Sequence, residues 1–159
     1  MKISMNLSEL FTLGCISNIQ AYTDVAEIIQ ILGEPDQVND SVFRDEKDGV
    51  EILSENFIYP NIVIAAYNKK IESIEIRFIG ESRTKNLELD GYSTFQKINK
   101  EKFRELVLEN GGEIVNDELV EIWEVWQICY RLNKKYVMAF FWTTECSLTN
   151  IVYYCPCLE

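Results

Sequence analysis

The sequence predicts an α+β fold in which two principal helices pack on a mainly antiparallel sheet. Three observations lead to this class. Residues 23–33 and 99–112 carry apolar residues at helical spacing, strand candidates follow each of these segments, and short Asn-Lys-Lys turns at 68–70 and 133–135 join strand candidates as hairpins do. A chain of 159 residues has the usual size of one domain and can bury about 70% of its unfolded surface. We therefore expect a single compact domain over residues 1–159.

The first principal helix gives the clearest local signal. Thr23 or Asp24 can serve as its N-cap, and Gly33 suits the left-handed residue that ends a helix. Between them the apolar residues recur at helical spacing: Val25, Ile28, Ile29 and Leu32. Ahead of this helix, residues 6–14 predict a short helix with its terminal glycine, and residues 15–22 predict a short strand.

Strands are expected to dominate the next region. Residues 36–56 are polar and charged, and we interpret them as a long loop or a weak hairpin. Residues 57–67 and 71–80 predict two antiparallel strands, because apolar and polar side chains alternate along the second of them. The connection over 80–94 contains a short strand candidate at 87–89.

The second principal helix begins after Asn99 as N-cap and ends at Gly111. Its buried face is expected to carry Phe103, Leu106 and Val107. Three strand candidates follow, at residues 119–132, 136–143 and 150–154.

The two halves of the chain look alike. Each principal helix is followed by Val-Asn-Asp, at residues 38–40 and 115–117, and then by a hairpin with an Asn-Lys-Lys turn. Residues 23–79 and 99–154 are therefore candidates for a tandem helix-plus-hairpin duplication, in which each helix covers part of a shared sheet. Helix, glycine and hairpin are also a common order, so chance identity is the alternative.

The net charge of −11 is concentrated in two segments. Residues 34–55 hold eight acidic and two basic residues, a net charge of −6, and residues 113–124 hold five acidic residues and no basic one. If the two halves are equivalent, these segments occupy corresponding places and share one side of the protein. A surface of one sign steers an oppositely charged protein and repels phosphates, so we expect a basic protein partner and no nucleic acid. Acidic loops that only maintain solubility are the alternative.

Trp123 and the acidic residues are the candidate partner-binding residues. If residues 119–132 form one strand, the even-numbered residues, Ile122 among them, face inward with Glu124 as the exception, and Trp123 stands among carboxylates on the exposed face. Tryptophan is enriched among residues that dominate binding energy, although the helix of its own half covering Trp123 is the alternative. The candidate set is Asp36, Asp40, Asp45, Glu46, Asp48, Glu113, Asp117, Glu118, Glu121, Trp123 and Glu124.

Catalysis and metal binding are not expected. The chain has no histidine, which removes the commonest general base and metal ligand. Carboxylate or lysine chemistry remains as an alternative, with Glu121 and Glu124, or Asp117 and Glu118, as the candidate acids. The second pair is disfavoured because neighbouring residues of a strand point to opposite faces. Five cysteines at irregular spacing do not form a disulfide framework, so we expect reduced thiols and no cofactor. A soft metal held by Cys146, Cys155 and Cys157 is the minor alternative.

A resemblance to a known family adds a more specific hypothesis. The helix ending in LGEPD (32–36), followed by YPNIVIAAYNKKIESIEIRF (59–78), resembles small bacterial proteins that include immunity proteins of polymorphic-toxin and contact-dependent-inhibition systems. The resemblance covers residues 23–79 and departs from the family at Pro60-Asn61, where glycine is usual. It implies a protein that binds and neutralises a toxin in the cytoplasm, and it assigns no catalytic residue.

The start of the chain agrees with a cytoplasmic location. It lacks the basic and apolar regions of a signal peptide, and no segment approaches the roughly 20 apolar residues of a membrane span. A regulatory or structural adaptor with no toxin partner, and a small carboxylate-based enzyme, remain as alternatives. The sequence does not specify the oligomeric state.

Overall fold

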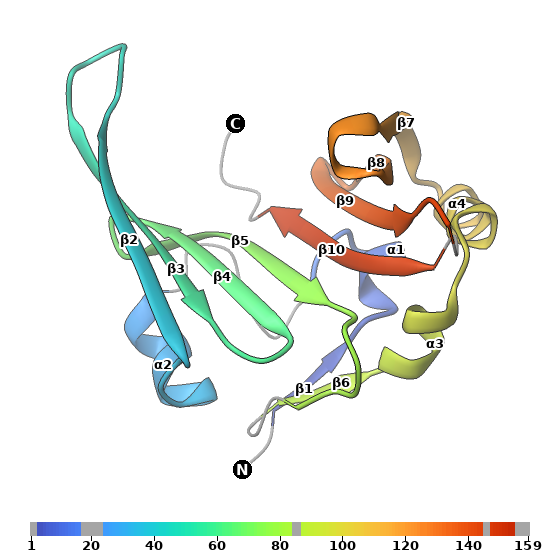
Figure 1. The fold of residues 1–159 in the computed structure, drawn as a ribbon, viewed down its shortest axis with the longest axis horizontal. Coiled ribbons are helices and arrows are strands. Elements are labelled where there is room, and N and C mark those ends of the chain that lie inside the picture. Colours follow the sequence, from blue (N-terminus) through green and yellow to red (C-terminus); the bar gives the residue numbers. More distant parts are fainter. Residues whose placement is uncertain (1–2, 17–23, 84–86, 145–146, 155–159) are drawn as a thin grey trace.

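The computed structural model describes residues 3–16, 24–83, 87–144 and 147–154, and its main feature is an eight-stranded antiparallel sheet (Figure 1). The strand order is β2-β3-β4-β5-β10-β9-β8-β7, and β1 and β6 form a separate parallel pair. The strands are β1 (Ile3–Asn6), β2 (Gln37–Arg44), β3 (Glu51–Ile58), β4 (Ile62–Tyr67), β5 (Lys70–Arg77), β6 (Leu87–Asp90), β7 (Glu113–Val120), β8 (Val125–Leu132), β9 (Lys135–Trp142) and β10 (Leu148–Tyr154). The α-helices of the described residues are α1 (Glu9–Thr12), α2 (Val25–Leu32), α3 (Tyr92–Lys97) and α4 (Lys100–Glu109). The predicted class, antiparallel sheet with helices packed on it, is confirmed.

The sheet consists of two meanders of four strands each. Helix α2 precedes β2–β5 and helix α4 precedes β7–β10, and the two meanders join where β5 pairs with β10. Read inward from either edge, the strands therefore follow chain order. This order places β2 and β7 at opposite edges of the sheet.

The two Asn-Lys-Lys turns do not occupy matching positions in these meanders. Asn68 and Lys69 connect β4 to β5, whereas Asn133 and Lys134 connect β8 to β9, which are the second and third strands of their meander. All four residues have positive φ, from 49° to 68°, as two-residue type I′ hairpin turns require. The sequence thus predicted both hairpins, but their shared turn sequence is not evidence that the halves correspond.

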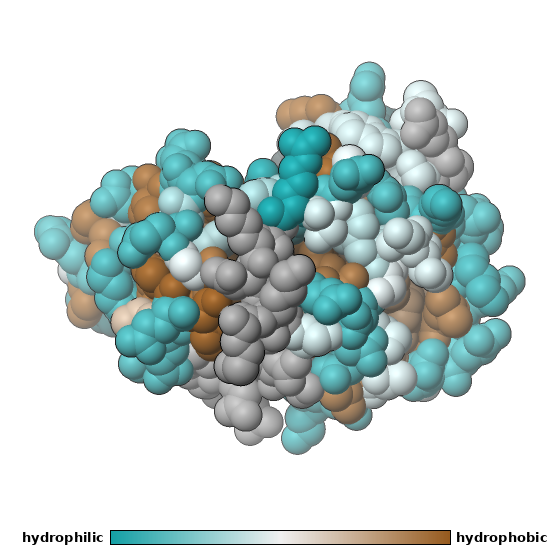
Figure 2. Space-filling model, turned by 90° about the horizontal axis from the view of Figure 1, so that it is seen from below, coloured by the Kyte–Doolittle hydropathy of each residue, from teal (hydrophilic) through white to brown (hydrophobic). Residues whose placement is uncertain are grey.

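One face of the sheet forms the core with the helices. Side chains at alternate strand positions, such as Ile74, Ile151 and Tyr130, are buried in the same hydrophobic cluster as the buried face of each principal helix. The ring of Phe103 in α4 packs 5.4 Å from that of Phe141 in β9. On the surface of the protein, for example on the face shown in Figure 2, hydrophobic residues lie in separate groups among hydrophilic ones.

The predicted ends of the principal helices are confirmed. The side chain of Asn99 accepts a hydrogen bond of 2.8 Å from the backbone N–H of Lys102, so it caps α4. Asp24 occupies the N-cap position of α2, but its carboxylate pairs with Lys70 and makes no capping hydrogen bond, and the other candidate, Thr23, lies outside the described residues. The α2 C-cap Gly33 has φ 83°. Gly111, just beyond α4, also has φ 83°.

The strand assignment of residues 36–67 needs correction. Residues 36–56 are not a loop, because β2 and β3 pair along their full length as a regular hairpin, the second of the two interpretations. Residues 57–67 are not one strand, because the chain turns at residues 59–61 between β3 and β4. Tyr59 N–H donates to the carbonyl of Ile62 across this turn (2.8 Å), and Pro60, which has no N–H, sits within it.

The elements outside the eight-stranded sheet also differ from prediction. Strand β1 and helix α3 were not predicted, and α1 is shorter than the expected helix over 6–13. The short strand candidate at 87–89 is confirmed as β6, which pairs in parallel with β1. Cys15 and Ile16 are not in a strand, and residues 17–22 of that strand candidate lie outside the described residues.

Gly33 is expected to be sensitive to substitution. Its φ of 83° combined with ψ of −175° is a conformation that only glycine adopts readily. Gly33→Val should lower the free energy of unfolding by about 1–3 kcal/mol, measured by urea denaturation. Gln30→Ala, at an exposed position of α2, should change it by less than about 0.5 kcal/mol. Equal effects of the two substitutions would show that α2 does not end in this conformation.

Two buried tyrosines should make stability fall at high pH. Tyr59 donates from its hydroxyl to the carbonyl of Gly33 (2.8 Å), and Tyr130 donates to the carbonyl of Leu10 (2.5 Å). Burial, with a smaller effect of the Glu34 carboxylate, raises the pKa of Tyr59 to about 12, and burial raises the pKa of Tyr130 still further.

Because folding favours the protonated hydroxyls, their contribution is complete below the unfolded pKa of about 10 and is lost as pH rises, for Tyr59 between pH 10 and about 12. Unfolding free energies measured from pH 8 to 12 should fall less steeply for Tyr59→Phe than for the native protein. Parallel curves for the two proteins would contradict this prediction.

A candidate protein-interaction surface

The segment expected to form one strand over residues 119–132 is interrupted. Strand β7 ends at Val120, a 3-10 turn η1 covers Glu121–Trp123, and β8 begins at Val125. Between them Glu124 adopts a left-handed conformation with φ 55°. The prediction of a continuous strand is therefore wrong, and strand alternation does not decide which side chains before Val125 are exposed.

The turn projects two large apolar side chains into solvent. Ile122 is 85% exposed, which corrects its assignment to the inward face, and Trp123 is 63% exposed. The interpretation that a helix covers Trp123 is wrong, and its predicted exposure among carboxylates is confirmed. Glu121 and Glu124 flank the pair and are exposed as well. We call these four residues, Glu121–Glu124, the η1 surface.

Further apolar residues lie next to the η1 surface. Leu119, near the end of β7, and Trp142, which pairs with Val125 in the sheet, are both exposed. The hydroxyl of Thr143 donates to the carbonyl of Glu124 (3.1 Å), which fixes the left-handed residue against the end of β9. The exposed apolar residues therefore stand on an ordered turn.

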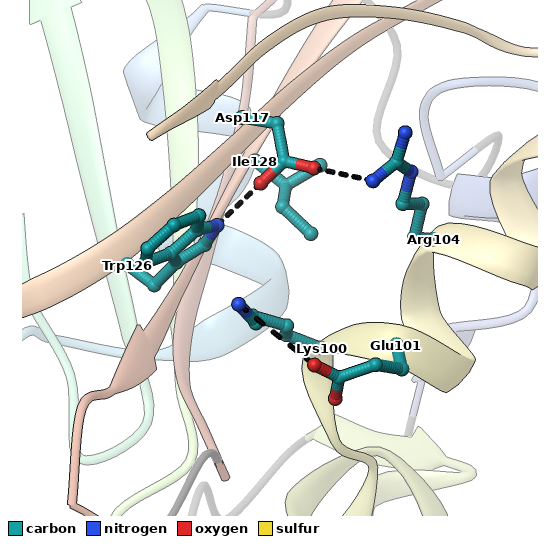
Figure 3. Close-up of a pocket in the computed structure, with 6 residues that line it drawn as sticks. All are labelled: Lys100, Glu101, Arg104, Asp117, Trp126 and Ile128. Carbon is teal, nitrogen blue, oxygen red and sulfur yellow. Dashed lines mark hydrogen bonds and ion pairs between the residues drawn. The ribbon is translucent and has the colours of Figure 1, made fainter. Parts of the chain in front are cut away.

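A polar cavity of about 320 Å³ lies between α4 and strands β7 and β8 (Figure 3). Its lining residues are Lys100, Glu101, Arg104, Asp117, Trp126 and Ile128. Asp117 pairs with Arg104 at 3.0 Å and accepts a hydrogen bond from the indole N–H of Trp126. The ammonium of Lys100 lies 3.6 Å from the centroid of the Trp126 ring. These residues pair with one another, so their contacts join α4 to β7 and β8 across the cavity.

The acids predicted for partner binding in residues 113–124 therefore differ in availability. Asp117 is half-buried and engaged in the cavity, and Glu113 pairs with Arg131 at 2.6 Å. Glu118 is exposed and accepts a hydrogen bond from the Asn116 side chain (2.9 Å). Glu118 and the acids of the η1 surface are thus exposed, and Glu113 is exposed as well but is paired with Arg131.

The other acidic segment forms the β2–β3 hairpin, which extends from the body of the protein on the far side from β7 (Figure 1). Asp36, Asp40, Glu46 and Asp48 are exposed. In the hairpin turn, carboxylates of the half-buried Asp45 and of Asp48 accept the backbone N–H groups of Lys47 (2.7 Å) and Val50 (2.9 Å). The two acidic segments lie at opposite edges of the sheet, so the structure does not bring them together as one cluster.

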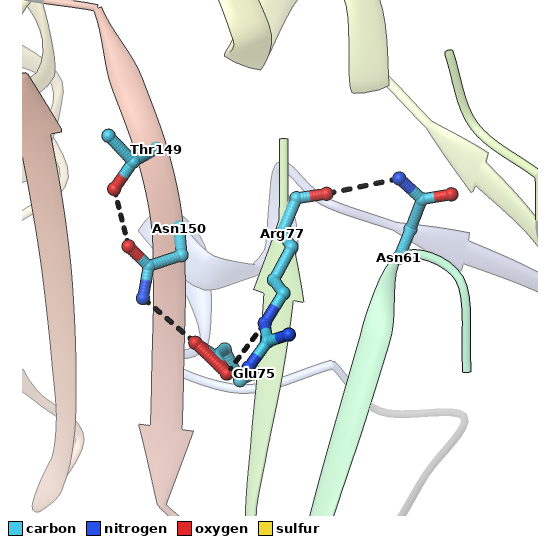
Figure 4. A network of polar contacts seen from close by, with 5 residues as sticks. All are labelled: Asn61, Glu75, Arg77, Thr149 and Asn150. Atoms are coloured by element: carbon cyan, nitrogen blue, oxygen red, sulfur yellow. Dashed lines mark hydrogen bonds and ion pairs between the residues drawn. The ribbon is translucent and has the colours of Figure 1, made fainter. Parts of the chain in front are cut away.

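A polar network connects the two meanders at the centre of the sheet (Figure 4). The Asn150 side chain of β10 donates to Glu75 of β5 (3.0 Å), and Glu75 accepts a second hydrogen bond from Arg77 (3.1 Å). Asn61, which is buried, donates to the carbonyl of Arg77 (3.2 Å). These groups satisfy each other, so we assign the network to the β5–β10 junction and not to ligand binding.

Sequence reasoning missed Ile122, Leu119 and Trp142 as surface residues. One signal for the first was present: alternation along residues 119–132 places Glu124 on the inward face, where an unpaired carboxylate is unfavourable. That inconsistency falls at the residue where the chain leaves the strand conformation. The sequence contains no such signal for Trp142, because its exposure depends on its position at the end of β9, which the alternation pattern does not show.

The remaining predictions concern metal, thiols and membrane. Cys146, Cys155 and Cys157 lie outside the described residues, and within those residues no group of three potential metal ligands occurs. Cys15 and Cys129 are free thiols. Among the described residues, no helix has the length and apolar character to cross a membrane.

Comparison with known proteins gives a likeness of fold. No protein-family model and no curated protein matches the chain. A solved structure, that of an extracellular protein containing an SCP domain from Bacillus anthracis strain Ames, superposes with a TM-score of 0.50 at 9% sequence identity. The match covers 87% of this chain and 44% of that one, so this chain spans less than half the neighbour's length. At this identity the likeness concerns the fold alone.

Proposed function

We propose that this protein is a non-catalytic binding protein with a basic protein partner, and more specifically an immunity protein that neutralises a toxin by covering its active site. The observation that carries the proposal is the η1 surface, where Ile122 and Trp123 stand exposed between carboxylates. Large apolar side chains inside a polar rim are typical of the centre of a protein interface.

The energetics of the η1 surface favour a partner. Covering an exposed isoleucine or aromatic side chain is worth about 1.5–3 kcal/mol each. Surface loops that expose such residues on a rigid scaffold are a common place for binding residues. Glu118, Glu121 and Glu124 around the pair would select a positively charged partner and speed its approach.

The toxin as partner is supported by the family resemblance of residues 23–79 and by charge. Many nuclease toxins are basic, and an acidic protein that covers such an active site needs no chemistry of its own. Inhibition of this kind would take place in the cytoplasm of the producing cell, the compartment we propose for this chain. An adaptor would use the same surface for a partner that is not a toxin.

We also propose that the two halves, residues 23–79 and 99–154, derive from duplication of a helix-and-strands unit. The inward order of strands from both edges supports this, since each principal helix precedes a four-stranded meander. The proposal does not rest on the Asn-Lys-Lys turns, which join different strands in the two halves. Duplication would explain why an acidic edge strand follows each principal helix.

Co-purification from the native strain tests the proposed function. Tagged native protein and Trp123→Ala should be expressed in parallel, and the bound chains identified by mass spectrometry. We expect a basic toxin domain to be retained by the native protein and depleted with the variant, and the toxin gene to lie immediately upstream. An acidic partner, or equal capture by both proteins, would contradict the proposal, and a basic partner without toxic activity would favour an adaptor.

A further inference from the structure

We propose that the outer edge of β2 binds an extended basic segment of the partner, which adds to the sheet as a ninth strand. This inference rests on the proposed function for the sign of the partner's charge, and it concerns a surface at the opposite edge of the sheet from the η1 surface. Strand addition at a sheet edge gives affinity through backbone hydrogen bonds and specificity through alternate side chains.

The first observation is that the β2 edge is long, regular and open. All eight residues of β2 are exposed, and they pair with β3 in an unbroken register from Gln37↔Ile58 to Arg44↔Glu51. No described strand pairs with the outer side of β2. The other edge strand, β7, has a register shift between Ile114 and Asn116 and packs against α4.

The second observation fixes which backbone groups face outward. Asp45 N–H donates to the carbonyl of Val50 (2.9 Å), and this pair continues the β2–β3 register. Hydrogen-bonded pairs alternate in an antiparallel ladder, so odd-numbered residues of β2 bond to β3. On the other side of β3, Asn68 N–H donates to the carbonyl of Leu53 (2.8 Å), which gives the same phase.

The outward N–H and C=O groups therefore belong to four residues that share one face, Val38, Asp40, Val42 and Arg44. They form a continuous row of donors and acceptors of the kind that an added strand needs. Val38 is 45% and Val42 is 63% exposed, so the row presents apolar side chains on both sides of Asp40.

The third observation is that the edge has few of the features that usually prevent pairing, the charged residues Asp40 and Arg44 being the exception. Natural edge strands carry lysine, proline, bulges or a covering element. Strand β2 has neither proline nor lysine, its register has no bulge, and its one basic residue, Arg44, lies 3.9 Å from Glu51 of β3.

The charge of the hairpin region favours a basic segment over a second copy of the chain at the β2 edge. Within β2 itself the charges of Asp40 and Arg44 balance, and Arg44 lies beside Glu51 of β3. The exposed residues around the strand, Asp36, Glu46 and Asp48 among them, nevertheless give the segment 34–55 a net charge of −6, so pairing of two copies through β2 would bring two such segments together. Like charges juxtaposed at an interface are unfavourable, whereas a basic strand would be attracted. The geometry fits a segment with apolar residues opposite Val38 and Val42 and a basic residue opposite Asp40.

A synthetic peptide of alternating valine and lysine, with blocked ends, is the probe. It should bind the native protein with 1:1 stoichiometry in calorimetry, and amide hydrogen exchange of Val38, Asp40 and Val42 should slow in its presence. Val42→Pro removes one outward N–H without removing a bond to β3 or changing the charge, and it should weaken binding at least tenfold. Val42→Thr keeps the N–H and the β-branched shape, so binding should stay within about threefold.

A second form of the test leaves the protein unaltered, in case Val42→Pro does not fold. The same peptide with N-methyl groups on alternate residues, placed along one edge and then the other, keeps its charge but can pair through one edge only. Methylation of the pairing edge should abolish binding. Equal binding of all peptides would show nonspecific charge attraction, and a dimer of the native protein through β2 in sedimentation would show a second copy; each overturns the proposal.

These results are separable from the proposed function. A partner captured through Trp123 whose binding is unaffected by Val42→Pro would overturn strand addition and leave the proposed function standing. If the peptide pairs with β2 but the protein captures no basic protein, strand addition would stand and the proposed function would be overturned.

Discussion

Trp123→Ala is expected to raise the dissociation rate of the partner about 30-fold, which corresponds to about 2 kcal/mol. The ring is 63% exposed in the unbound protein, so the effect comes from losing its burial in the complex. Most effects of interface substitutions appear in the dissociation rate, which surface plasmon resonance with the captured partner measures directly.

Matched controls separate binding from folding for Trp123. The unfolding free energy of Trp123→Ala should stay close to that of the native protein, because the side chain contributes little to the core. Tyr136→Ala removes another exposed aromatic side chain, from the opposite end of β9, and should leave the dissociation rate within about twofold. A Trp123→Ala protein that binds normally would remove the η1 surface from the interface.

Reversal of the acids around the η1 surface should slow association strongly. In the variant with lysine at Glu118, Glu121 and Glu124, the association rate should fall about 10- to 100-fold at low salt, because the attractive field at the docking site becomes repulsive. Asp117 is left unchanged, because its carboxylate forms an ion pair with Arg104 and accepts a hydrogen bond from Trp126. Stopped-flow measurement at several salt concentrations tests this.

The control changes the same number of charges at another place. Lysine at Glu101, Glu105 and Glu109 on α4 alters the net charge equally but should slow association much less. The native rate should also fall as salt rises, since the screening length is only about 8 Å at physiological ionic strength. If both triple variants slow association equally, net charge alone attracts the partner and the η1 surface has no special role.

Prediction from sequence succeeded where local rules dominate. The ends of α2 and α4 follow from residues whose conformations are restricted: Gly33 and Gly111 take positive φ, and Asn99 caps by its own side chain. The hairpin turn at Asn68 is local in the same sense. The strand breaks at Pro60 and Glu124 were missed because apolar residues continue on both sides of each, which gives the pattern of a single strand.

The sequence by itself determined the α+β class, both principal helices and the two Asn-Lys-Lys hairpin turns, whereas it left Trp123 either exposed or covered by a helix. The determined features depend on contacts within a few residues, or on the periodicity of burial. Only the tertiary structure decided that the acidic segments lie at opposite edges, that Asp117 is engaged with Arg104 and Trp126, and that β2 keeps an open edge. Strand order is set by long-range pairing, such as that of β5 with β10, and the chain's local pattern is compatible with several such orders.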